Sequence, residues 1–190
     1  MKKINLFINL TFCIFLIFSY SLTMANEEVK YNVVHKTDVY EIREYSDRLV
    51  VQAAIYNDGG TFRKLFNYIS GANKSSEKIE MTRPVTQIKK DNLSFMQFYL
   101  PSKFNKITTP IPSNPDVKIK LIKKGHFAVI RYSGRSSDKN FSKHSKILYN
   151  ELLEDKILIN GLAIKATYNS PFTPPPLRRN EVMFSVKWES

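Results

Sequence analysis

The same order of secondary-structure patterns occurs twice along the chain, and no other feature of the sequence limits the possible folds as strongly. In each half, alternating apolar residues predict two strands, an apolar residue at every third or fourth position predicts a helix, and two further stretches predict two more strands. These elements occupy residues 39–56, 61–71, 77–88 and 93–101 in the first half, and 117–134, 136–152, 161–169 and 181–188 in the second. The sequence therefore predicts a tandem pseudo-repeat of strand–strand–helix–strand–strand.

Apolar periodicity also predicts which side of each helix faces the sheet. The expected inner stripes are Phe62, Leu65, Phe66 and Ile69 in the first helix, and Phe141, Ser145, Leu148 and Leu152 in the second. Thr61 is the expected N-cap of the first helix, which ends near Gly71, and residues 136–140 supply the cap of the second. Both helices are thus expected to pack through one face.

These elements predict an α+β fold with a single domain. Eight or nine strands with only two helices should curl into a distorted β-barrel, with the two helices packed on its outside. The proline-containing segment at residues 106–116 separates the halves, which extend over about residues 30–105 and 116–190. We therefore expect one domain over residues 26–190.

A proline interrupts the third strand of each half. Pro84 lies inside the strand-like stretch "EKIEMTRPVTQI", and Pro171, in "NSPFTPPPLRRN", is expected to interrupt the matching strand of the second half. Proline cannot donate to a strand ladder, so each is expected on an edge strand or at a bulge. Two interrupted strands would leave two irregular rims, at which a small barrel can admit a ligand.

Residues 1–25 have the layout of a secretory signal peptide. Lys2 and Lys3 precede a long apolar run, and Ala25 provides a small residue for cleavage. This predicts export to the periplasm or the medium; the alternative is an uncleaved N-terminal membrane anchor. The single cysteine, Cys13, lies within the apolar run, so the region from residue 26 onward offers neither a disulfide nor a thiolate metal site.

The formal charge of the chain is +12, and removing Lys2 and Lys3 with the signal peptide leaves 12 − 2 = +10. A positive balance of this size attracts anionic partners. Because an exported protein seldom meets nucleic acid, we expect no nucleic-acid partner. Anionic small molecules, lipid headgroups or envelope polymers are better candidates.

The sequence contains no recognisable catalytic motif: it has no glycine-rich phosphate loop, no HExxH and no GxSxG. We therefore expect a binding protein without enzymatic activity. Of the three histidines, His144 borders the inner stripe of the second helix. It is interpreted first as a boundary residue with satisfied hydrogen bonds, and second as an axial ligand to a haem iron.

Two basic segments have two interpretations each. In "TPPPLRRNEV", Arg178 either clamps a carboxylate or phosphate, or fixes the entry to the last strand through internal hydrogen bonds, and the second is favoured. On the first helix, Arg63, Lys64 and Asn67 lie on the outward side, where solvated charge is the simpler explanation.

Several motifs, in a fixed order over residues 40–184, resemble the SOUL haem-binding protein family. They are "YEIREY" at 40–45, "NYISGAN" at 67–73, "KIEMTRPVTQ" at 78–87, "YLPSKF" at 99–104 and "RRNEVMF" at 178–184. The combination of "KIEMTRPV" with "RRNEV" is the specific part of the resemblance. It implies a distorted barrel of eight or nine strands with two helices, built as a pseudo-repeat.

For function, the resemblance implies reversible, non-covalent binding of haem or another tetrapyrrole in a shallow apolar groove. In one branch of the family this groove lies between the first helix and the loop before "RRNEV", and basic residues there meet the propionates. Phe66 stands at an apolar groove position, but Asn67, Thr173 and Gly59 stand where that branch has basic residues. Glu44 stands where other members have a histidine.

Neither ligand set is thus complete, and the nearby Arg63, Lys64 and Arg178 are the candidates for replacing the missing propionate contacts. The implied role is that of a monomeric exported carrier or buffer of haem, porphyrin or another amphipathic anion. One alternative is a small-molecule sensor or scavenger for a non-porphyrin ligand, because effector-binding domains have a similar duplicated plan. Another is a structural envelope protein that binds anionic surfaces.

Overall fold

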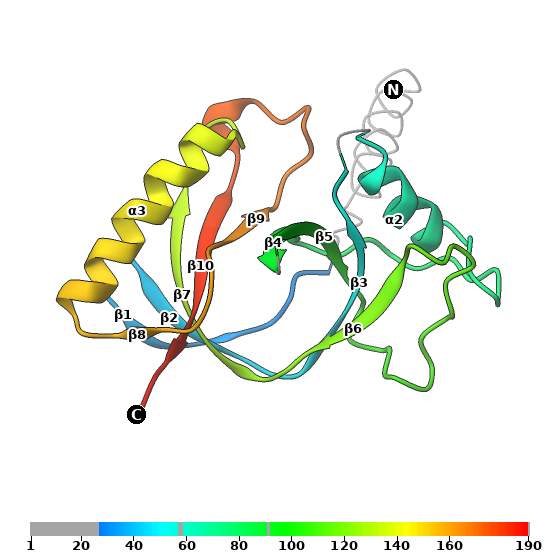
Figure 1. The fold of residues 1–190 in the computed structure, drawn as a ribbon, viewed down its shortest axis with the longest axis horizontal. Coiled ribbons are helices and arrows are strands. Elements are labelled where there is room, and N and C mark those ends of the chain that lie inside the picture. The colour runs from blue at the N-terminus through cyan, green and yellow to red at the C-terminus, as the bar shows by residue number, and fades with distance from the viewer. Residues whose placement is uncertain (1–26, 57–58, 91, 190) are drawn as a thin grey trace, which may run out of the picture.

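The computed structural model describes residues 27–56, 59–90 and 92–189, which form one curled antiparallel sheet with two helices packed on it (Figure 1). Nine strands follow one another across the sheet in the order β1-β2-β7-β10-β9-β4-β5-β3-β6, and the short β8 pairs with β10. The strands are β1 (Asn32–Lys36), β2 (Glu41–Tyr45), β3 (Arg48–Ala54), β4 (Val85–Lys90), β5 (Leu93–Tyr99), β6 (Lys118–Ile122), β7 (Gly125–Tyr132), β8 (Leu158–Ile159), β9 (Ile164–Thr167) and β10 (Asn180–Lys187). The helices are α2 (Thr61–Ile69) and α3 (Asp138–Glu154), and a 3-10 turn covers Pro175–Leu177.

The predicted α+β class, with a barrel-like sheet and two outer helices, is confirmed. The sheet is a half-barrel: within the described residues its path ends at β1 on one side and at β6 on the other. Figure 1 shows α3 and α2 on opposite sides of the molecule, each lying along its own part of the sheet.

The strand order confirms the predicted duplication and shows how the halves are joined. The first strand of each half pairs with the second strand of the other half: β2 with β7, and β6 with β3. The two third strands, β4 and β9, pair with each other at the middle of the path, with Thr86 opposite Ala166. The halves therefore share one continuous sheet.

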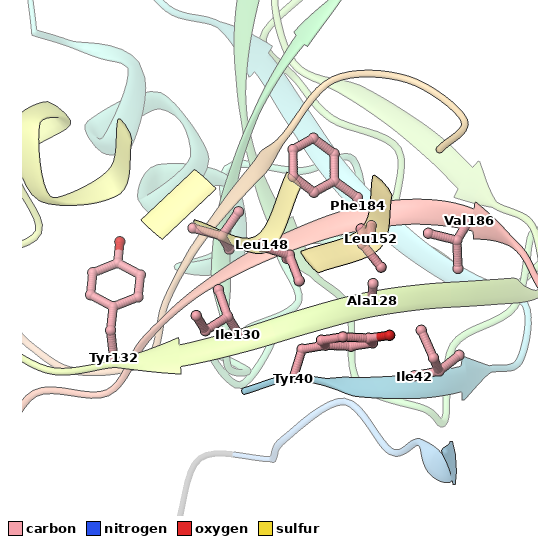
Figure 2. Close-up of a cluster of buried hydrophobic side chains, with 10 residues drawn as sticks. Tyr40, Ile42, Ala128, Ile130, Tyr132, Leu148, Leu152, Phe184 and Val186 are labelled. Atoms are coloured by element: carbon pink, nitrogen blue, oxygen red, sulfur yellow. The ribbon is translucent and has the colours of Figure 1, made fainter. Parts of the chain in front are cut away.

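Helix α3 covers the second half through the stripe that the sequence predicted. Leu148 and Leu152 are fully buried, and Phe141 packs partly buried against the same cluster. Figure 2 shows the two leucines among side chains of β2, β7 and β10, including Ile42, Ile130 and Phe184. The predicted cap is also present, because the Ser137 side chain accepts a hydrogen bond from the Asn140 backbone N–H.

Helix α2 differs from the prediction in which face it buries. Leu65 and Ile69 are buried as expected, but the third large buried residue is Tyr68, whereas Phe62 and Phe66 are 43% and 46% exposed. Thr61 is not the N-cap: Gly60 occupies that position, and the Thr61 hydroxyl donates to the Ala54 carbonyl oxygen. The buried stripe of α2 consists of Thr61, Leu65, Tyr68 and Ile69, so Phe62 and Phe66, each one residue after a member of the stripe, lie at its margin.

The two prolines lie outside the strands, so their predicted placement at an edge or bulge is wrong. Pro84 immediately precedes β4, and Pro171 lies in the loop between β9 and β10. Both third strands are internal to the sheet, since β4 pairs with β5 and β9, and β9 pairs with β10 and β4. An internal strand uses its backbone N–H groups for pairing and therefore excludes proline.

The expected signal peptide, residues 1–25, lies outside the described residues. In the part of the chain that the structure describes, no helix is long and apolar enough to cross a membrane.

Candidate functional site

Two aromatic side chains on α2, Phe62 and Phe66, are about half exposed. The rings of Phe62 and Phe66 stack with centroids 6.1 Å apart and planes inclined by 13°. Phe62 is also held against the core, because its ring meets buried Phe98 edge-on at a centroid distance of 5.1 Å. The sheet thus fixes the orientation of an aromatic pair that remains open to solvent.

The other residues predicted from the resemblance divide between two places. Arg63, Lys64, Phe66 and Asn67 lie together on α2. Arg63 and Asn67 are exposed there, whereas the Lys64 ammonium lies 2.9 Å from a carboxylate oxygen of Asp116. Lys64 is therefore partly neutralised by an acidic residue of the linker between the halves.

Thr173 and Arg178 lie together in the loop between β9 and β10. Arg178 donates from Nε to the Thr173 carbonyl oxygen at 2.7 Å and from Nη2 to the Pro171 carbonyl oxygen at 2.6 Å. The interpretation that Arg178 fixes the strand entry through internal hydrogen bonds is confirmed. The same loop holds two strongly exposed apolar side chains, Phe172 at 94% and Leu177 at 73%.

His144 lies on α3, which packs on β7, β8 and β10, whereas α2 packs on β3 and β5. Its ring stacks on Tyr132 at a centroid distance of 4.1 Å, and its Nδ1 lies 2.8 Å from the Asn140 carbonyl oxygen. The structure does not bring His144 together with the α2 residues. Within the described residues, no cluster of three or more His, Cys, Asp or Glu side chains is placed to hold a metal ion.

A cleft of about 680 Å³ lies elsewhere, between the segment before β1, the β2–β3 turn, the end of β5 and β6. Arg48 lines it, and the Arg48 guanidinium lies over the rings of Tyr45 and Phe127 at 4.2 and 4.9 Å from their centroids. No sequence pattern predicted this site. The residues around Arg48 come from strands that are far apart in the sequence, so no local sequence motif identifies the cleft.

The interior of the curled sheet holds a buried charge network centred on Glu181. Its carboxylate accepts hydrogen bonds from Arg43, Arg179 and the Tyr168 hydroxyl, at 2.9, 2.9 and 2.7 Å. Burial, and then the Glu181 charge, raise the pKa of Tyr168 far above its ordinary value. Two arginines thus compensate this fully buried carboxylate, so Glu181 offers no free negative charge to a cationic ligand.

The family comparison covers most of the chain. The family model described as SOUL heme-binding protein matches residues 26–185. No curated protein matches the sequence.

Several solved structures share the fold at low sequence identity. An uncharacterized conserved protein from Listeria innocua has a TM-score of 0.60 at 8% identity, over 80% of this chain and 94% of that one. The C-terminal domain of EcmrR has a TM-score of 0.57 at 12% identity, over 83% and 98%. A hydrolase from Listeria innocua has a TM-score of 0.56 at 9% identity, over 81% and 94%. These likenesses concern the fold, which by itself does not determine function.

Proposed function

Because the chain belongs to the SOUL haem-binding protein family, we propose that it binds haem or another tetrapyrrole reversibly and without a covalent bond, as an exported carrier or buffer. The family supports tetrapyrrole binding in general terms. The observation that carries the proposal for this chain is the exposed, stacked pair of Phe62 and Phe66 on α2.

The aromatic pair suits a flat apolar ligand. A porphyrin ring laid against Phe62 and Phe66 removes apolar surface from water, which contributes about 25 cal/mol per Å². The contact of Phe62 with Phe98 holds the pair in place before binding, so little side-chain freedom is lost when the ligand arrives.

The basic residues near this pair differ in how freely they can meet a propionate. Arg63 is exposed on α2, next to Phe62 in the sequence. Lys64 is already close to Asp116, and two nitrogens of Arg178 already donate to loop carbonyl oxygens. We therefore assign the main propionate contact to Arg63, with Lys64 and Arg178 contributing positive charge at longer range.

The residues present suit the macrocycle and its carboxylates better than they suit the iron. His144 packs on the part of the sheet that α3 covers, away from α2, and Glu44 replaces the histidine that other members have. The proposal thus assigns no protein ligand to the iron, and haemin and protoporphyrin should bind with similar affinity.

The remaining parts of the proposal concern location and chemistry. The basic start and apolar run of residues 1–25 support export, and N-terminal sequencing of the exported protein should then begin at Asn26.

We propose binding without catalysis. A cationic ligand is disfavoured because Arg43 and Arg179 already compensate Glu181.

A haemin titration followed at the Soret band tests the proposal. We expect saturation at one haemin per chain, at both low and high salt. Phe66→Ser should weaken binding by at least about tenfold, because burial of a phenylalanine is worth about 1.5–3 kcal/mol. The matched control, Leu153→Ser, removes a 54% exposed residue from α3 and should leave the affinity unchanged. A shift that never saturates, that salt abolishes, or that both variants weaken equally would contradict the proposal.

A further inference from the structure

Arg48 is a cation without a carboxylate partner among the described residues. Its Nη1 donates to the Ser46 carbonyl oxygen at 3.2 Å, while its Nε is buried without a hydrogen-bond partner in the part of the chain that the structure describes. Three rings surround the guanidinium, with the centroids of Tyr45, Phe127 and Tyr99 at 4.2, 4.9 and 5.8 Å. The rings stabilise the positive charge through their faces, but they do not accept hydrogen bonds from the N–H groups in the plane of the guanidinium.

The two acidic residues that line the same cleft have partners other than Arg48. The Asp47 carboxylate accepts the Lys124 backbone N–H at 2.7 Å and lies 3.3 Å from the Lys123 ammonium. The backbone hydrogen bond, and then Lys123, lower the pKa of Asp47. The Glu27 carboxylate accepts the Ser102 backbone N–H at 2.9 Å. Neither acid neutralises Arg48, so the cleft keeps an excess of positive charge.

The rest of the lining combines apolar walls with a basic rim. Buried Leu49, Tyr99 and Leu100 line the cleft together with partly buried Phe104 and Leu121. Exposed lysines Lys30 and Lys106 add positive charge. A volume of about 680 Å³ lies within the range of small-molecule sites, about 300–1,000 Å³.

We propose that this cleft is a second binding site, independent of the α2 face, for an amphipathic monocarboxylate such as an unbranched fatty acid. The carboxylate binds the Arg48 guanidinium, and the hydrocarbon chain lies against the apolar lining. A single enclosed arginine matches a single carboxylate, because its planar donors fit that group. The exposed lysines attract the anion toward the cleft.

Calorimetric titration of the purified protein with laurate, below its micelle concentration, tests the charge requirement. We expect one saturable site for laurate and binding at least tenfold weaker for dodecyltrimethylammonium, which has a tail of similar length and a cationic head. Equal binding of the two probes, or no saturable binding of laurate, would overturn the proposal.

Substitution of Arg48 locates the site. Arg48→Met keeps an apolar side chain of similar length and should weaken laurate binding by at least about tenfold, the loss expected for a charged hydrogen bond. Arg131→Met, at an exposed arginine on β7 outside the cleft lining, should change the affinity less than twofold. Equal affinities in the two variants would overturn the assignment.

Two further measurements keep the test decisive. If Arg48→Met does not fold, amide chemical shifts of the unmodified protein provide the location: laurate should move Leu49, Leu100 and Leu121 rather than residues of α2. Haemin at saturation should change laurate affinity less than twofold, and Arg48→Met should still bind haemin. Competition between the two ligands, with both lost in Arg48→Met, would place the tetrapyrrole in the cleft and overturn the second site. Failure of haemin to bind would contradict the proposed function but would not affect the proposal of a laurate site in the cleft.

Discussion

The Nη1 atom of Arg43 on β2 lies 2.9 Å from Oε2 of Glu181 on β10, and the two side chains are 4% and 0% exposed. Removing one member of a buried ion pair deprives the other charge of its buried partner. After loss of the Glu181 charge, Arg43 still pairs with Glu41 and Arg179 with Glu28, both of which are more exposed than Glu181. We therefore expect Glu181→Gln to lower the free energy of unfolding by about 3 kcal/mol, the lower end of the range for a broken buried pair. Urea denaturation measures the change.

The exposed pair of Lys187 and Glu189, with side-chain exposures of 61% and 79%, provides the control for that experiment. Glu189→Gln should change the stability by less than about 1 kcal/mol, as is usual for surface ion pairs. Similar losses in the two variants would mean that the buried network contributes no more than a surface contact.

Stability should decrease in alkaline solution. Burial raises the pKa of both Tyr68 and Tyr132 to about 12 from the ordinary value of 10.0. Between these values the unfolded chain releases phenolic protons that the folded chain retains, so a rising pH favours unfolding. Each tyrosine should cost about 1.4 kcal/mol of stability per pH unit in this window. Urea midpoints that stay constant from about pH 8 to about pH 11 would contradict this.

The hydroxyls of these two tyrosines should contribute differently at neutral pH. Tyr68 donates to the Pro110 carbonyl oxygen at 2.8 Å, whereas the buried Tyr132 hydroxyl has no hydrogen-bond partner among the described residues. Tyr68→Phe should cost about 1–3 kcal/mol, since it leaves a buried carbonyl unpaired, and Tyr132→Phe should be close to neutral. Thermal or urea unfolding of both variants distinguishes them, and a larger loss in Tyr132→Phe would show that its hydroxyl has an important partner.

His144 is expected to contribute to packing and not to iron binding. Its ring lies against Tyr132 and its Nδ1 is engaged by the Asn140 carbonyl, so His144→Ala should destabilise α3 by about 1 kcal/mol. The Soret spectrum of the haemin complex should be the same in the variant and the parent protein. A shifted Soret maximum in His144→Ala would instead identify the histidine as an axial ligand.

The two leucines Leu148 and Leu153 on α3 test the core shown in Figure 2. Leu148 is fully buried, whereas Leu153 is 54% exposed. Leu148→Ala should cost about 2–5 kcal/mol through lost burial and the cavity left behind, and Leu153→Ala less than about 1 kcal/mol. Equal effects would mean that α3 does not pack through the predicted stripe.

The sequence was sufficient to predict the architecture because alternation and helical period depend on local spacing. It was insufficient where a side chain's surroundings depend on the curvature of the sheet. Glu181 alternates with the apolar Val182 and Phe184 along β10, a pattern typical of a strand with one face in water, but the sheet curls around that face and buries Glu181 completely. Phe62 and Phe66 fit the helical period, yet α2 buries Tyr68 in their place and leaves both rings about half exposed.

The candidate sites show the same distinction. The α2 residues are neighbours in the sequence, so the motifs shared with a known family are sufficient to group them. The cleft could not be predicted in this way. Tyr45, Tyr99 and Phe127 reach Arg48 from three different strands, and only the strand order brings them together.

The exchange of first strands between the halves has a consequence for how the fold is maintained. In a chain of one half alone, the second strand would lack the neighbour that β2 or β6 now provides, and only another copy could supply it. Such an assembly would dissociate on dilution. Joining the two copies through the segment at residues 106–116 makes the pairing intramolecular, at an effective concentration set by the linker and not by protein abundance. The duplicated chain can therefore remain folded at low protein concentrations.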